Sequence, residues 1–260
     1  MDLGLATRLV VITGASMGIG RATALALAEE GAALLLAARN ASRLAEVADE
    51  ARRRGAAEVT TLAGDMTAAD GLDRLRDAVE SLPVWSLVTC VGSTPLGSFD
   101  EVDDETWSRA VEMKFMATVR AIRIVLPSMR RSGGGRIVLV GGNTAWAPDP
   151  WMVTSGAMNA ALGNLAATLG RQLGHEGIGV VCVHPGPTRS ARFDALEASV
   201  TARFGGDEEA AREHLRDLSP RGVPAEPAEI GGAISYLCSP VAAHLTATGV
   251  GIDGGQSWAR

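Results

Sequence analysis

A glycine-rich stretch near the start of the chain has the composition of a phosphate-binding turn. It reads Thr-Gly-Ala-Ser-Met-Gly-Ile-Gly over residues 13–20, after the apolar run 9–12 and before a helical pattern that starts near Arg21. Glycines let the backbone turn tightly and approach a pyrophosphate, and the N-terminus of the next helix supplies N–H donors and a positive dipole end. Because the turn joins the first predicted strand to a helix, it predicts a dinucleotide site.

The residue after the second predicted strand bears on which dinucleotide binds. The strand 33–37 is followed by Ala38 and Arg39. An acidic side chain there would bind a ribose 2′-hydroxyl, whereas an arginine can pair with a 2′-phosphate. We therefore expect NADP rather than NAD. The alternative is that Arg39 is a surface residue at the start of a helix.

Lys114 is the one lysine among the 24 Lys and Arg residues of the chain. With a helical period of 3.6, it lies on the same apolar stripe as Trp107, Val111, Ala121 and Val125, so we expect it to point inward. Burial disfavours the charged ammonium and lowers its pKa toward values useful for proton transfer. Lys114 is thus either a proton donor or a structural amine that donates to carbonyls where its helix meets the sheet.

Alternating strand and helix patterns must position these residues. The predicted strands are 9–13, 33–37, 59–63, 86–91, 136–140, 179–183 and 249–252. The predicted helices are 21–30, 41–54, 68–81, 103–131, 152–173 and 226–237, with short helices in a lid over 187–217. We expect the helix 103–131 to bend or end near Pro127.

The alternation predicts one α/β domain over residues 1–260. Its fold class is a Rossmann-type three-layer sandwich, a doubly wound parallel seven-stranded sheet with helices on both faces. The ligand of such a sheet binds at the carboxyl ends of the strands, where the strand order reverses. One crevice should therefore gather residues from these loops: 14–20, Arg39, Asp65, Gly92, 141–144 and 185–188.

Composition and charge argue against several other classes. The net charge is −6, and no basic stripe with interleaved aromatic residues suggests nucleic acid. No apolar run of the length of a membrane span is present. The cysteines, Cys90, Cys182 and Cys238, all lie in apolar runs, which fits a reducing, cytoplasmic compartment. The histidines show no metal-ligand spacing with them, so we expect no metal.

With these residues placed, the chain resembles the short-chain dehydrogenase/reductase family over nearly its full length. The shared motifs are 13–20, Gly64-Asp65-Met66, Pro185-Gly186, and the tail from Pro224-Ala225-Glu226 to Asp253-Gly254-Gly255. The resemblance implies a nicotinamide dinucleotide, with Asp65 and Met66 at the adenine and Pro185, Gly186 and Thr188 near the nicotinamide amide. The expected cofactor-binding residues are Gly14, Ser16, Met17, Gly18, Ile19, Gly20, Arg39, Asn40, Asp65, Met66, Val91, Gly92, Pro185, Gly186 and Thr188.

The resemblance fails at the residues that carry the family's chemistry, which are normally Asn, Ser, Tyr and Lys. Alignment places Lys114, Gly142, Ser155 and Asn159 at these four positions, so all four differ. The usual tyrosine proton donor is therefore missing, and lysine and asparagine have exchanged helices.

Two further side chains are candidates near these positions. Asn143 could polarise a carbonyl or merely cap its loop, and Ser155 could relay a proton only if an amine or water activates it. The predicted catalytic residues are Lys114, Ser155, Asn159 and Asn143.

Three functions remain open. The favoured one is an NADP-dependent oxidoreductase acting on the carbonyl or alcohol of a small molecule, with Lys114 as proton donor. The others are a non-redox lyase or isomerase, in which Lys114 acts as a base or forms an imine, and a catalytically silent NADP(H)-binding protein.

The resemblance also implies a homodimer or homotetramer that pairs the long helices 103–131 and 152–173. Leu165 and Leu169 on the second of these helices could lie in such an interface or face the chain's own sheet.

Overall fold

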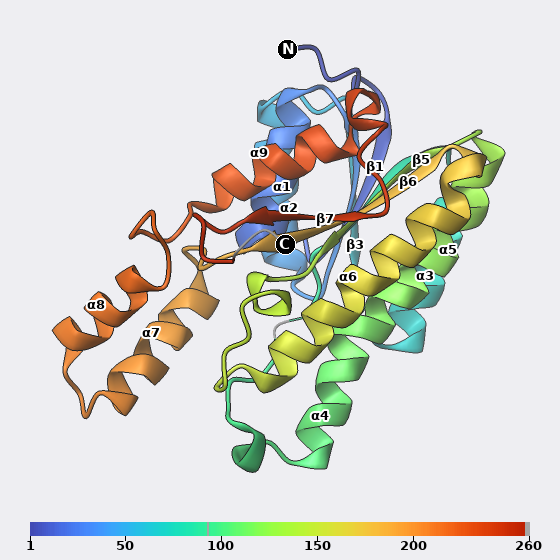
Figure 1. The fold of residues 1–260 in the computed structure, drawn as a ribbon. Coiled ribbons are helices and arrows are strands. Elements are labelled where there is room, and N and C mark those ends of the chain that lie inside the picture. Colours follow the sequence, from blue (N-terminus) through green and yellow to red (C-terminus); the bar gives the residue numbers. More distant parts are fainter. Residues whose placement is uncertain (93, 258–260) are drawn as a thin grey trace.

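Seven strands form one parallel sheet in the computed structural model, which describes residues 1–92 and 94–257 (Figure 1). The strand order is β3-β2-β1-β4-β5-β6-β7, so the direction of winding reverses between β1 and β4. The strands are β1 (Leu9–Thr13), β2 (Ala33–Ala38), β3 (Glu58–Ala63), β4 (Val84–Thr89), β5 (Gly135–Val140), β6 (Ile178–Pro185) and β7 (Thr248–Ile252). The predicted doubly wound parallel sheet is confirmed.

Helices connect the strands and cover both faces of the sheet. They are α1 (Gly18–Glu29), α2 (Ala41–Arg53), α3 (Ala69–Val79), α4 (Asp104–Ala110), α5 (Ala117–Arg131), α6 (Val153–Leu173), α7 (Ala191–Arg203), α8 (Glu208–Asp217) and α9 (Pro227–Cys238). Of these helices, none is long and apolar enough to span a membrane.

Adjacent residues of the strands pack into two separate cores. Val10 and Ile12 of β1 belong to the core under α1, α2 and α9, whereas Val11 belongs to the core under α3, α5 and α6. Figure 1 shows α1, α2 and α9 on one side of the sheet and α3, α5 and α6 on the other. Burial on both faces explains why the strand sequences are continuously apolar. Leu165 and Leu169 of α6 pack, partly buried, against the second core.

The long helical segment before β5 differs from the prediction. It does not end at Pro127, because α5 continues to Arg131. Proline removes the hydrogen bond to the carbonyl four residues earlier, but Pro127 and Arg123 are both exposed, so water can satisfy that carbonyl. The irregularity lies earlier, where residues Val111–Met116 form a π-helical turn between α4 and α5. This turn contains Lys114.

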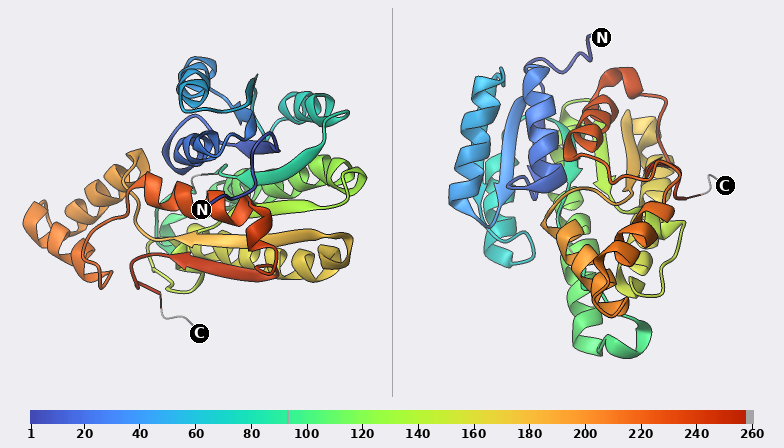
Figure 2. Two further views of the ribbon diagram at one scale, coloured as in Figure 1. Left: turned by 90° about the horizontal axis from the view of Figure 1, so that it is seen from above. Right: turned by 90° about the vertical axis from the view of Figure 1, so that its left-hand side faces the viewer.

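Two further segments refine the predicted boundaries. Strand β4 ends at Thr89, two residues before the predicted end, so Cys90 and Val91 belong to the loop that follows. Helices α7 and α8 are the short helices predicted in the segment 187–217, called the lid below, and they project as a pair from the sheet (Figures 1 and 2).

Candidate active site

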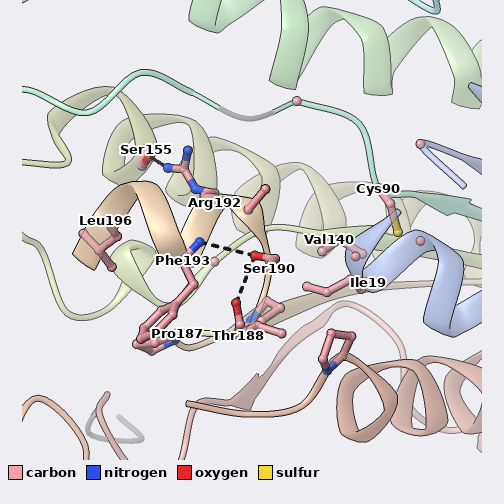
Figure 3. Close-up of a pocket in the computed structure, with 18 of the residues that line it drawn as sticks. Ile19, Cys90, Val140, Ser155, Pro187, Thr188, Ser190, Arg192, Phe193 and Leu196 are labelled. Carbon is pink, nitrogen blue, oxygen red and sulfur yellow. Dashed lines mark hydrogen bonds between the residues drawn. The ribbon is translucent and has the colours of Figure 1, made fainter. Parts of the chain in front are cut away.

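A cavity of about 2000 Å³ extends along the carboxyl ends of the strands and under the lid. Every predicted cofactor-binding residue lines it, and so do Lys114, Asn143, Ser155 and Asn159. Figure 3 shows part of this lining, where Ile19, Cys90, Val140 and Ser155 surround one space with residues from the start of the lid. The predicted residues therefore meet in one crevice, where the direction of winding reverses between β1 and β4.

The glycine-rich turn forms a cradle that only glycine fits. Gly14 has a φ of +72°, and a Cβ on it would lie 2.5 Å from the Cys90 carbonyl oxygen. A Cβ on Gly20 would lie 2.2 Å from the Gly14 carbonyl oxygen. Helix α1 begins at Gly18, and no side chain caps its first turn. The free N–H groups of this turn suit a phosphate, so the cradle fits a dinucleotide.

The part of the cavity next to the end of β2 is lined by basic residues. Arg39 follows β2, is exposed, and lies near enough to Asp65 for its charge to act on that carboxyl. The pKa of Asp65 is lowered chiefly by the backbone N–H of Thr67 and further by the Arg39 charge. Asn40 caps α2, because its Oδ1 accepts from the N–H of Arg43 at 3.0 Å. Arg43, four residues after Arg39, also lines the cavity. The sequence analysis did not predict this residue.

Lys114 points inward, as predicted. Its half-buried side chain lines the cavity and its Nζ donates to the carbonyl oxygen of Gly141, at the end of β5, over 3.3 Å. Burial, and to a smaller extent the positive charge of Arg192, lower the pKa of Lys114 to about 8. An amine with this pKa exchanges its proton near neutral pH.

The π-helical turn holds Lys114 against the loop after β4. Gly92 in this loop has a φ of +93°, and a Cβ on it would lie 2.8 Å from the Met113 carbonyl oxygen and 2.9 Å from the Lys114 Cα. The loop therefore packs backbone to backbone on the turn. This close contact requires glycine at position 92 and helps to fix the position of the Lys114 Cα.

Ser155 is buried beneath an arginine from the lid. The Ser155 Oγ accepts from Nη2 of Arg192 at 2.9 Å (Figure 3). It also shares a hydrogen bond with the Thr94 hydroxyl. Nη1 of Arg192 donates to the Thr94 carbonyl oxygen at 2.7 Å. Burial lowers the pKa of the Arg192 guanidinium.

The sequence prediction missed both Arg192 and Thr94. Arg192 is one of 23 arginines, and no sequence pattern separates it from those on the surface.

The Asn159 side chain fills the space that a side chain at position 142 would need. A Cβ on Gly142 would lie 2.5 Å from the Asn159 Nδ2, which instead donates to the Thr144 Oγ1 at 2.9 Å. Within the described residues, the Asn159 Oδ1 and the Asn143 Nδ2 are buried and make no hydrogen bond. Buried polar groups are rarely left in this state, so these two atoms fit contacts with a bound molecule. The Asn143 side chain makes no described bond that would cap its loop.

His184 and two tryptophans support the far wall of the site. The His184 ring shares a hydrogen bond of 3.0 Å with the Gly142 carbonyl oxygen and packs on Trp146. Burial lowers the pKa of His184. The guanidinium of Arg203 lies over the Trp151 ring, with its Cζ 4.2 Å from the ring centre. This contact connects the lid to this wall.

Comparisons with known proteins agree with this architecture. Residues 8–200 match the family profile described as short chain dehydrogenase. The chain is 30% identical over 251 residues to 2,3-dihydro-2,3-dihydroxybenzoate dehydrogenase of Escherichia coli, which covers 95% of this chain and 96% of the relative. It is 28% identical over 253 residues to the NADPH-dependent reductase BacG of Bacillus subtilis, over 96% and 97% of the two chains.

A solved structure is similar along nearly its whole length. The crystal structure of L-sorbose reductase from Gluconobacter frateurii, in complex with NADPH and L-sorbose, superposes with a TM-score of 0.91. The two chains are 30% identical, and the match covers 98% of each.

Proposed function

The chain belongs to the short-chain dehydrogenase family, and from this membership we propose that it is an NADP-dependent oxidoreductase that interconverts a carbonyl and an alcohol on a small molecule. One observation carries the proposal. The glycine cradle and the amine of Lys114 line the same cavity, so a nucleotide and a proton donor can face one substrate.

The residues present fit NADP. The cradle leaves the first N–H groups of α1 for the pyrophosphate, and Arg39 and Arg43 offer two guanidinium groups for a 2′-phosphate. The neighbouring Asp65 and Met66 would contact the adenine. The L-sorbose reductase structure contains NADPH and BacG is named an NADPH-dependent reductase, which supports the same choice.

NADPH, held by the glycine cradle with Arg39 and Arg43, would supply the hydride for the carbonyl carbon and would leave as NADP⁺. The Lys114 ammonium gives a proton to the carbonyl oxygen as that oxygen takes the electron pair of the π bond. The neutral amine then regains a proton from solvent. Its pKa of about 8 suits both halves of this exchange, because the two protonation states are close in free energy at cellular pH.

The geometry supports a rearranged active site in place of the family's usual one. Asn159 occupies the space that a serine at position 142 would need, and the short side chain of Ser155 leaves room that Arg192 fills. The four substituted positions are thus mutually consistent. We infer that Lys114 is the proton donor, that Ser155 and Asn159 position groups around it, and that Asn143 hydrogen-bonds the reacting oxygen.

The same proposal includes the domain and its assembly. Residues 1–260 act as one domain in which the segment 187–217 closes over the substrate, and α5 and α6 pair between subunits of a homodimer or homotetramer. Light scattering checks the assembly, and a particle of 26.9 kDa would contradict it.

Cofactor titration followed by turnover tests the function. We expect NADPH fluorescence to report binding at micromolar concentration, with NADH binding more weakly. The NADPH-loaded protein should then lose NADPH absorbance with a member of a carbonyl panel. No binding below millimolar concentration would contradict the proposal, and tight binding without hydride loss would favour the silent binding protein.

A further inference from the structure

Helix α7 of the lid is attached to the substrate end of the cavity near both of its own ends. Near its start, Arg192 donates to the Ser155 Oγ and to the Thr94 carbonyl oxygen. At its last residue, the guanidinium of Arg203 lies over the ring of Trp151. The stretch of α7 between these two contacts therefore lies over this part of the cavity.

The face of α7 that lines the cavity is apolar. Phe193, Leu196 and Val200 share one side of the helix by their spacing, and all three line the cavity. Figure 3 shows the first two of them in this lining. The acidic residues of the same helix, Asp194 and Glu197, do not line it. Because Phe193 and Val200 are seven residues apart, the apolar face extends about 10 Å along the helix.

Apolar residues of two other segments line the same cavity. Trp151 and Met152 come from the segment before α6, and Met152 precedes Ser155 by three residues, so the apolar lining begins beside the substrate end. Leu215 and Leu218 come from the end of α8 and the residue that follows it. Trp151 is 37% exposed, which leaves apolar surface for a ligand to cover.

Several polar side chains in this part of the cavity are paired within the protein. Arg189 lies 2.7 Å from Glu226, and the Asp149 carboxylate accepts from the N–H of Trp151 at 2.8 Å. A ligand with many hydroxyl groups would have to compete with these contacts. Hydrocarbon would instead gain free energy by leaving water. The lining under α7 therefore suits a ligand whose polar group lies at Lys114 and whose remainder is apolar.

We propose that the substrate is a ketone or aldehyde with a hydrocarbon body, which lies under α7 while its carbonyl group meets Lys114. This inference rests on the proposed function and names its substrate class. The product in the reducing direction is an alcohol with the same hydrocarbon body, with the hydride on the former carbonyl carbon and the proton on its oxygen. Because the body contacts α7, its burial would also hold the lid closed.

A homologous series of ketones tests the need for a hydrocarbon body. Straight-chain 2-ketones of about four, six, eight and ten carbons are each compared with the analogue that carries a hydroxyl group on its last carbon. We expect kcat/KM with NADPH to rise about threefold per added methylene until the space under α7 is filled. The hydroxylated eight-carbon analogue should be about tenfold poorer than its parent. A kcat/KM that does not change with chain length, or a preference for the hydroxylated analogues, would overturn the inference.

Variants of Leu196 separate a substrate contact from a structural role in the lid. Leu196→Ser should lower kcat/KM for the eight-carbon ketone about tenfold and change that for the four-carbon ketone by less than about twofold. Leu196→Met keeps the apolar volume and should retain the dependence on chain length.

The matched control adds the same hydroxyl group to the outer side of the helix. Ala195 is exposed and does not line the cavity, so Ala195→Ser should affect neither ketone. An equal loss for the short and the long ketone in Leu196→Ser would show a structural role in the lid and overturn the inference.

Calorimetry gives a readout that does not depend on turnover. The NADP⁺-loaded protein is titrated with the six- and eight-carbon ketones at several temperatures. Burial of apolar surface gives a negative heat-capacity change, which we expect to be larger for the longer ketone and smaller in Leu196→Ser. The absence of binding by every ketone of the series would overturn the inference, and the proposed function would stand if NADPH still binds and polar carbonyl compounds are still reduced. Failure of the wild-type protein to bind NADPH would reject the proposed function itself.

Discussion

The two ends of the cavity are built in different ways. The nucleotide end is formed by backbone: Gly14, Gly18 and Gly20 lie within seven residues, and no side chain caps the first turn of α1. The substrate end is formed by side chains from separate segments, with Lys114 before α5, Ser155 on α6 and Arg192 on α7. A local backbone turn tolerates little change, whereas scattered side chains can be replaced one by one. This difference supports our proposal that one end keeps the family pattern while the other departs from it.

The sharpest test of the substrate end is removal of the amine. Lys114→Met should lower kcat about 100- to 10,000-fold, the range of a general acid, and should change the Kd for NADPH by less than about threefold. Single-turnover kinetics and a fluorescence titration measure the two effects. Turnover within a few-fold of wild type would remove Lys114 from the chemistry and leave it the structural role of donating to the Gly141 carbonyl.

The nucleotide end is tested by adding one methyl group to its backbone. Gly20→Ala should lower the free energy of unfolding by about 3 kcal/mol, because the new Cβ would meet the Gly14 carbonyl oxygen. Gly18→Ala is the control: it meets open space and should cost only about 1 kcal/mol, for its φ of +53°. Urea denaturation compares them, and equal losses would show that the packing of the turn is not the constraint.

Arg39 tests whether the nucleotide end selects the 2′-phosphate. Arg39→Glu should weaken NADPH binding about 10- to 100-fold and leave NADH binding unchanged or slightly stronger, because the new carboxylate repels the phosphate and can accept from a ribose hydroxyl. Parallel titrations with the two nucleotides give the ratio. A parallel loss for both nucleotides would mean that Arg39 acts only on the fold.

The pH dependence follows from the lowered pKa of Lys114. Reduction needs the protonated amine, so its rate should be constant below pH about 8 and fall about tenfold per unit above it. Alcohol oxidation needs the neutral amine and should rise toward the same pH. Lys114→Arg stays protonated and should abolish both changes. A break that persists in this variant belongs to another group.

Stability should respond to the same amine. Because the folded pKa of about 8 lies below the ordinary value of 10.5, the unfolded chain binds more protons between these limits. The free energy of unfolding should therefore gain a contribution that rises with pH over this window. Chemical denaturation at several pH values should show this rise in wild type, and Lys114→Met should lack it.

The smallest expected effect concerns the pair Gly142 and Asn159. Gly142→Ser should cost about 1–2 kcal/mol of folding free energy, because its Cβ meets the Asn159 amide. With Asn159→Ala the same serine should cost less, giving a coupling of about 1 kcal/mol in a double-mutant cycle. Additive effects would show that the two substitutions are independent.

Most of the fold could be predicted because its signals are local. Continuous apolar runs such as 33–37 indicate strands buried on both faces. Their alternation with helices predicts a doubly wound parallel sheet. The glycine turn and Arg39 could be identified for the same reason, since each follows directly on a strand. The helix was predicted to bend or end near Pro127, and it does not end there. Helix propensity does not record that this side of the helix faces water.

The composition of the substrate end could be predicted only in part. Lys114 was found because it is the single lysine and lies on an apolar stripe. Arg192 was missed because its contact with Ser155 crosses 37 residues of chain and depends on where the lid settles. The π-helical turn at Val111–Met116 was also missed; it packs closely against Gly92, in a separate segment of the chain.

The sequence by itself determined a dinucleotide cradle, a parallel sheet and an inward lysine, because each depends on neighbouring residues or on the period of one element. Only the tertiary structure decided that Arg192 joins Lys114 in the substrate end and that Asn159 fills the space above Gly142. Those contacts link segments far apart in the chain, and their distances are set by the packing of whole elements, which no local pattern records.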